Sequence, residues 1–135
     1  MKVFLDTNVL ASALTTRGLC AELFEVVLQG HELLISSAVI QELERILPRK
    51  LGQSASVTEG FVALLRAEAL LVAGSPPFPS LPDPDDELII ASALTGQAHV
   101  FVTGDKALLK LQCVEHLPVI SPRQFWELLA GREAY

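Results

Sequence analysis

The chain has 135 residues, 50% of them hydrophobic and only 6% aromatic, with a formal net charge of −6. This length supports one hydrophobic core, and we expect a single domain over residues 1–135. Taken alone, the acidic balance argues against a nucleic-acid-binding protein, because the surface that binds nucleic acid is usually basic.

We expect no targeting segment from the sequence. An acid follows the opening residues before an apolar signal segment could form, and no apolar run approaches the roughly 18 residues of a membrane span. Cys20 and Cys113 have neither metal-ligand nor disulfide-framework spacing, so we expect buried, reduced thiols. These features favour a cytoplasmic protein with no membrane association.

Strand-like and helix-like stretches alternate along the first half of the chain. We expect strands at 2–6 and 31–36 and helices at 19–30, 38–47 and 56–69. Ser36 or Ser37 can cap the second of these helices, which we expect to end at Pro48. Ser56 and Glu59 have the spacing of a capping box for the third.

The second half continues the alternation after a proline-rich connection. Residues 75–84 hold five of the eight prolines and predict a stiff surface segment. We expect strands at 70–74, 99–105 and 117–121 and helices at 85–96, 106–111 and 121–131. In the last helix Ser121 and Gln124 form a capping box and Gly131 is the stop. The whole order predicts an α/β fold whose parallel sheet carries helices on both faces.

Two of the predicted strands end on an acid. The stretch "VFLDTN" delivers Asp6 and "VFVTGD" delivers Asp105, each at the carboxyl end of its strand. An ordinary turn explains either acid alone, since Asp and Asn bond their own backbone and break strands. If the two strands are neighbours, however, the carboxylates converge at the edge where open α/β sheets bind ligands.

The stretch "DPDDEL" opens the helix at 85–96. Its acids have a complete structural explanation, because Asp83 can cap the helix and the acids after Pro84 complement the helix dipole. Helical periodicity adds that Asp86 shares a stripe with the apolar side chains, whereas Asp85 lies nearer the polar side. Asp86 therefore points toward the sheet, where an ionised carboxylate needs a metal or a cationic partner.

The helix at 38–47 offers two more acids, Glu42 and Glu44. Both flank its apolar stripe at similar angles, so periodicity does not choose between them. A solvated helix face, with Glu42 and Arg45 as an i,i+3 pair, explains them without a function. The three histidines have no ligand spacing, and no nucleophile elbow, dinucleotide fingerprint or P-loop is present.

Taken in order, Asp6, Glu42, Asp86 and Asp105 resemble the acidic tetrad of the PIN domain family. The resemblance runs through "FLDTNVLASAL", "SSAVIQELERIL", "PDDELIIASAL" and "VFVTGDKALL". It implies a three-layer α/β/α sandwich around a mostly parallel sheet, and an endoribonuclease that depends on Mg²⁺ or Mn²⁺ and cuts single-stranded or structured RNA. The terminal "VISPRQFWELL" also fits the VapC-like branch of toxin components, which implies a small antitoxin partner and a homodimer.

The resemblance also assigns roles within the tetrad. It selects Glu42 over Glu44. It makes Asp6 and Asp86 metal ligands, Asp105 a ligand directly or through water, and Glu42 the holder of a second ion or of the attacking water. These oxygen ligands suit Mg²⁺ or Mn²⁺, which lowers the pKa of a bound water and accepts phosphate oxygens. Three further residues would orient the acids or the phosphate: Thr7, Asn8 and Thr103.

Three other interpretations of the sequence stay open. The first is a PIN-like module that binds nucleic acid or forms complexes and cleaves little or nothing. The second is a haloacid-dehalogenase-like phosphatase, although that family carries D-x-D after its first strand and Asn8 stands at the third position here. The third is a structural α/β domain without chemistry, which Mg²⁺ and Mn²⁺ would not stabilise.

Overall fold

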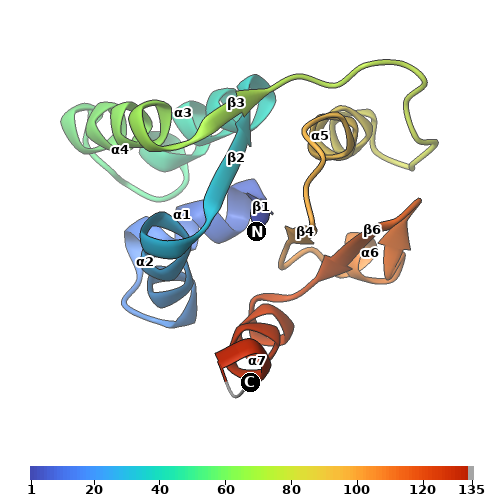
Figure 1. Cartoon of the computed structure of the whole chain (residues 1–135). Helices are drawn as coiled ribbons and strands as arrows, with labels where there is room; N and C mark the ends of the chain where they lie inside the picture. The colour runs from blue at the N-terminus through green and yellow to red at the C-terminus, as the bar shows by residue number, and fades with distance from the viewer. Residues whose placement is uncertain (134–135) are drawn as a thin grey trace.

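The computed structural model describes residues 1–133 as a six-stranded sheet with helices on both sides (Figure 1). The strands are β1 (Lys2–Leu5), β2 (Glu32–Ser36), β3 (Leu70–Val72), β4 (Val100–Val102), β5 (Cys113–Val114) and β6 (Leu117–Ile120). The helices are α1 (Thr7–Thr15), α2 (Leu19–Gly30), α3 (Ser37–Arg49), α4 (Ala55–Glu68), α5 (Pro84–Thr95), α6 (Lys106–Leu109) and α7 (Pro122–Glu133).

The strand order places the ends of β1 and β4 together. The sheet runs β3-β2-β1-β4-β6-β5, and every pair is parallel except β5 with β6. The chain builds outward from β1 to β3 and then crosses back to β4 on the other side of β1, so the order reverses between β1 and β4. Ligands of open α/β sheets bind at the carboxyl ends of the strands beside such a reversal.

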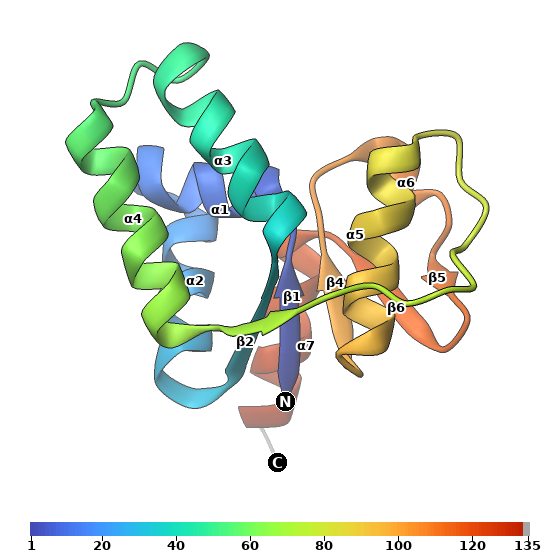
Figure 2. The ribbon, with the colours of Figure 1, turned by 90° about the horizontal axis from the view of Figure 1, so that it is seen from above.

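Helices cover both faces of this sheet, which makes three layers. Leu33, Leu34 and Ile35 are consecutive residues of β2, and all three are buried, as expected for a strand packed on both faces. Figures 1 and 2 show α1 and α2 on one side of the sheet and α5 on the other. The predicted α/β/α architecture with a mostly parallel sheet is therefore confirmed.

The position of α5 depends on a close backbone approach. A Cβ atom on Gly74 would lie 2.8 Å from the Cβ of Ala91 and 3.2 Å from two backbone atoms of α5. Only glycine allows the chain that leaves β3 to pass this closely. Since α5 also packs against β2 and α3, this contact fixes the helix that carries Asp86 relative to the sheet.

The main element that the sequence patterns missed is α1. The stretch after β1 carries turn-forming residues, but Asp6 acts as the N-cap of a helix that starts at once at Thr7. Its carboxylate oxygen Oδ1 accepts a hydrogen bond from the Thr7 backbone N–H at 2.8 Å. Asp6 thus ends a strand and starts a helix with no loop between them.

Several predicted boundaries were wrong by a few residues. Ser54, not Ser56, caps α4, and its hydroxyl accepts from the Val57 backbone N–H. Helix α3 continues past Pro48, because proline removes only its own N–H and Lys50 still donates to the Ile46 carbonyl at 2.9 Å.

The C-terminal part also differs in detail from the prediction. Helix α7 continues past Gly131, because glycine only weakens a helix and does not force it to end. Its predicted Ser121–Gln124 capping box is confirmed by two reciprocal hydrogen bonds of 2.9 and 3.1 Å.

The two-residue strand β5 was not predicted. It exposes Cys113, and Cys20 is only half-buried, so the expectation of two buried thiols was wrong. Within residues 1–133, no helix has the length and apolar character to cross a bilayer.

Candidate active site

Asp6 lies in the most constrained position of the carboxyl edge of the sheet. Its side chain is 7% exposed, and both of its oxygens accept hydrogen bonds. Oδ1 accepts from the backbone of Thr7, and Oδ2 accepts from the Thr103 hydroxyl at 2.7 Å. Because Thr103 follows β4, this bond joins the carboxyl ends of the two central strands and fixes the orientation of the carboxylate.

The Thr103 hydroxyl also positions the second predicted acid. Its oxygen accepts a hydrogen bond from the Asp105 backbone N–H at 3.1 Å while its proton goes to Asp6. Asp105 in turn caps α6 by accepting from the Ala107 backbone at 2.8 Å. Asn8 joins the same turn, since its Oδ1 accepts from Gly104 at 3.3 Å. Thr103 therefore contacts Asp6 and the Asp105 backbone directly, whereas Asn8 contacts only the backbone of the turn between them.

Burial and mutual repulsion make Asp6 and Glu42 reluctant to ionise. The pKa of Asp6 is raised chiefly by burial and also by the charge of Asp105, although the hydrogen bonds from Thr103 and Thr7 lower it. The pKa of Glu42, in α3, is raised by burial and by the charges of Asp6 and Asp85, against lowering effects of Thr7 and Arg45. Both acids are therefore held in a site that disfavours negative charge.

Asp86, at the start of α5, is the fourth predicted acid of this group. The pKa of Asp86 is raised to about 6. Burial is the largest cause, and repulsion from the charges of four other acids adds to it: Asp83, Asp6, Asp105 and Glu42. The other three predicted acids therefore all act on Asp86, which the structure places near them at the start of α5.

Of the two acids that the sequence prediction did not select, Asp85 lies in the cleft beside Glu42, and Glu44 lies apart from the group. Asp85 is exposed, whereas Asp86 is partly buried. Glu44 lines a separate cavity against α4, together with Thr58 and Arg66. Asp86 is thus the more buried of the two acids at the start of α5, and the packing of α3 separates Glu42 from Glu44, which periodicity alone did not.

The donor set of this group suits a hard divalent cation that keeps part of its water. All the groups offered are oxygens, and their mutual repulsion is relieved when a cation binds. Across residues 1–133, no three acidic, histidine or cysteine side chains are close enough together to coordinate one ion without added ligands. Mg²⁺ is commonly held by one or two carboxylates and several waters, so this wider spacing fits it.

One buried hydroxyl supports the same fit. The Thr7 Oγ1 atom is buried, and among the buried side-chain N and O atoms of the described residues it is the one that forms no well-formed hydrogen bond. It faces Glu42 closely enough to lower the pKa of that carboxyl group. A buried hydroxyl without a well-formed hydrogen bond is costly, so either the Glu42 carboxylate or a ligand or water beside it would be its partner.

A comparison with known protein families agrees with this geometry. The family model described as the PIN domain matches residues 2–107, which contain all four predicted acids. The chain belongs to the PIN domain family. PIN domains are nucleases, so the chain has the fold and the family membership of a nuclease. No curated protein sequence matches the chain.

Solved structures share the fold of this PIN domain. One is VapBC2 from Rickettsia felis bound to a promoter DNA fragment, with 16% identity, coverage of 90% of this chain and 98% of the other, and a TM-score of 0.67. VapBC-1 from nontypeable Haemophilus influenzae gives 19% identity, coverage of 91% and 99%, and a TM-score of 0.63. The PIN domain endonuclease Utp24 gives 19%, coverage of 89% and 84%, and a TM-score of 0.53.

Sequence reasoning missed a cleft beside the acids of this PIN domain. A cavity of about 290 Å³ opens between α3 and α5 and is lined by Ala38, Gln41, Glu42, Arg45, Asp85 and Leu88. The spacing of Glu42 and Arg45 is visible in the sequence, but it predicted only an ion pair on a solvated face. The crossing of α3 and α5, which turns that face into a cleft wall, follows from tertiary structure.

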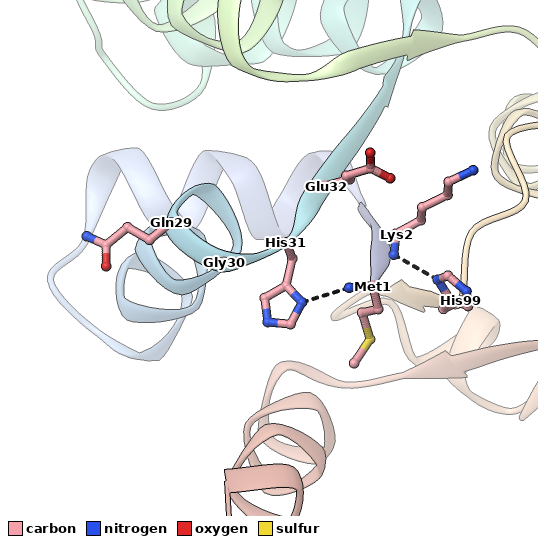
Figure 3. A pocket seen from close by; sticks show the side chains of 7 residues that line it. All are labelled: Met1, Lys2, Gln29, Gly30, His31, Glu32 and His99. Carbon is pink, nitrogen blue, oxygen red and sulfur yellow. Dashed lines mark hydrogen bonds between the residues drawn. The ribbon is translucent and has the colours of Figure 1, made fainter.

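A larger cavity lies at the opposite edge of the sheet. Its volume is about 400 Å³, and Figure 3 shows its lining, which includes Met1, Lys2, His31 and His99. Here two hydrogen bonds join polar groups of the lining. The Met1 ammonium lies 3.0 Å from His31 Nδ1, and the Lys2 backbone donates to His99 Nδ1 at 2.8 Å. None of the four predicted acids lies at this edge.

Proposed function

We propose that this PIN domain is a divalent-metal-dependent endoribonuclease that hydrolyses phosphodiester bonds of single-stranded or structured RNA. The observation that carries the proposal is the electrostatic coupling of Asp6, Glu42, Asp86 and Asp105 at the reversal of strand order. Asp6, Glu42 and Asp86 have raised pKa values, and titratable groups with perturbed pKa values concentrate at functional sites.

Each residue has a distinct task in the proposed reaction. Asp6, Asp86 and Asp105 would hold Mg²⁺ or Mn²⁺, directly or through water. Thr103 fixes the orientation of Asp6 and the backbone of Asp105. Glu42, whose pKa is raised, is suited to accept a proton from the attacking water near neutral pH. The bound ion would supply an activated water and stabilise the leaving oxygen.

We further propose that the chain acts as the toxin of a toxin–antitoxin pair. Two structures that share its fold, VapBC2 and VapBC-1, are of VapBC assemblies, and the terminal "VISPRQFWELL" fits the same branch. The proposal includes a small antitoxin protein, a homodimer and a cytoplasmic location. Co-expression with the product of a neighbouring short reading frame, followed by co-purification, tests the partner.

Cleavage of a mixed RNA pool tests the catalytic proposal. We expect cutting in Mn²⁺ or Mg²⁺, none in EDTA, and a loss of at least about 100-fold in the Asp6→Asn variant, because a ligand carboxylate is removed. Asparagine also caps helices, so α1 keeps its start. Glu25→Gln, on the exposed face of α2, is the matched control. Cutting that persists in EDTA, or in Asp6→Asn, would overturn the proposal. A well-folded protein that binds RNA without cutting it would indicate the binding module instead.

A further inference from the structure

The cleft beside Glu42 continues as a groove along the start of α3. The cavity of about 290 Å³ adjoins a second one of about 140 Å³, and the two share Ala38 and Leu88 as lining residues. The second cavity extends to the end of β3, where Gly74 and Ser92 form its walls. The groove thus runs from an acid of the candidate active site past small side chains that leave room for a chain.

Arg45 is the single cation among the lining residues of both cavities. Its guanidinium forms no ion pair within 4 Å in the described part of the chain, where the one such pair joins Arg123 and Glu127. It acts on Glu42 only at longer range, by lowering the pKa of that carboxyl group. An exposed guanidinium with free donors is suited to bidentate binding of a phosphate.

We propose that the groove holds the single-stranded substrate and that Arg45 binds a backbone phosphate next to the one that is cleaved. This inference rests on the proposed nuclease function and makes Arg45 a positioning residue. It is also compatible with the net charge of −6, because a cation inside the cleft can bind one phosphate without a basic surface around it. A cavity of about 290 Å³ is at the lower end of the size of ligand sites, which suits one nucleotide unit and not a duplex.

A purely structural role for Arg45 predicts a different outcome. If Arg45 only offsets the charge of Glu42, its loss would move the pH profile of kcat and leave substrate affinity unchanged. If Arg45 binds a phosphate, its loss raises KM and weakens binding more than it lowers kcat. It also reduces the salt dependence of binding, because one counterion fewer is released.

The test measures binding and cleavage of one short fluorescein-labelled single-stranded RNA of mixed sequence. Binding is followed by fluorescence anisotropy in Ca²⁺ over a range of KCl concentrations, and cleavage by gel in Mn²⁺. For Arg45→Gln we expect about 10-fold weaker binding, which corresponds to one lost charged hydrogen-bonding partner, and a salt slope smaller by about 0.7. Arg45→Lys should restore part of the affinity, since it keeps the charge but loses the fork.

Two further variants bracket this result. Arg66→Gln removes the same charge at the end of α4, in the cavity that contains Glu44, and should change binding by less than about 2-fold. Asp85→Asn removes a negative charge from the cleft itself and should strengthen binding, most clearly at low salt.

The outcomes separate this inference from the proposed function. Equal binding by the wild-type chain, Arg45→Gln and Arg66→Gln would overturn the inference even if the chain cleaves RNA, and so would a wild-type chain that does not bind the oligonucleotide. Weaker binding by Arg45→Gln alone, in a chain that cuts no RNA in Mn²⁺, would support the groove and overturn the nuclease.

Discussion

The two edges of the central sheet treat their polar groups in opposite ways. At the amino edge, Lys2 begins β1 and His99 precedes β4, and the Lys2 backbone N–H donates to His99 Nδ1 (Figure 3). At the carboxyl edge the same two strands lead into Asp6 and Asp105. There the charges repel, and the pKa of Asp6 is raised. The larger cavity lies at the amino edge and the unfavourable electrostatics at the carboxyl edge.

This contrast indicates that mutual repulsion between acidic side chains points to the candidate active site better than the volume of a cavity does. A structural network pairs its donors and acceptors, as the Met1 ammonium with His31 and the Lys2 backbone with His99 do at the amino edge. A group of carboxylates that raise one another's pKa values costs stability, and that cost is offset only when a cation binds.

The largest effect is expected from changing opposite ends of β4. Asp105→Asn should lower Mn²⁺-dependent RNA cleavage by at least about 100-fold, because a carboxylate of the metal site is lost. His99→Ala should change cleavage by less than about 2-fold and cost about 1 kcal/mol of stability through one lost hydrogen bond. Gel assays and urea unfolding measure both. A His99→Ala variant as inactive as Asp105→Asn would remove the distinction between the edges.

A smaller loss is expected from the hydroxyl that joins Asp6 to Asp105. Thr103→Val removes the donor to Asp6 and the acceptor for the Asp105 backbone, so cleavage should fall by about 10- to 100-fold, as for groups that orient metal ligands. Thr103→Ser keeps the hydroxyl and should recover most of the activity. Similar activity of the valine and serine variants would contradict the orienting role.

Much of this edge, but not its assembly, was predictable from the sequence. Asp6 and Asp105 were identified because β-rich runs end on them, and Asp86 because it shares a stripe with apolar side chains. The adjacency of β1 and β4 depends on the crossover after β3, and local patterns do not encode it. For the same reason, periodicity left Glu42 and Glu44 equivalent until α3 was packed against its neighbours.

Two misses have a common physical cause. The residues at the start of α1 carry turn-forming chemistry, and only the continuation of the chain shows that this chemistry caps a helix. The spacing of Glu42 and Arg45 predicts a surface pair, and only the neighbouring α5 turns it into the wall of a cleft. In both cases the local signal was present and tertiary context decided its meaning.

Acidification should weaken metal binding at the carboxyl edge. The pKa of Asp86 is raised to about 6, so below that pH the protonated form predominates, and Mn²⁺ affinity should fall by up to about 10-fold per pH unit. Calorimetric titrations at about pH 5, 6 and 7 measure this change. The Asp86→Asn variant should bind more weakly with a flatter profile, whereas His99→Ala should keep the wild-type profile. A profile that flattens in His99→Ala would assign the titration to the amino edge.

The smallest effect concerns stability without metal. Because Asp86 binds its proton more tightly in the folded than in the unfolded state, the free energy of unfolding should fall as pH rises from about 4 to about 6. Solvent screening limits the effect to about 1 kcal/mol or less. At neutral pH in EDTA, Asp86→Asn should therefore melt a few degrees higher than the wild type, and the exposed neighbour variant Asp85→Asn should not. Equal melting temperatures of the two variants would show that the ionised Asp86 carboxylate does not destabilise the folded state.

The central claim is that one divalent cation site lies at the carboxyl edge of the sheet and none at the amino edge. Substoichiometric Mn²⁺, added during amide NMR spectroscopy, tests it directly because the ion broadens the signals of nearby residues. Thr7, Asp86 and Gly104 should broaden first in the wild type and not in Asp6→Asn, while His31 and His99 stay sharp. Early broadening of His31 and His99, or an unchanged pattern in Asp6→Asn, would contradict the account.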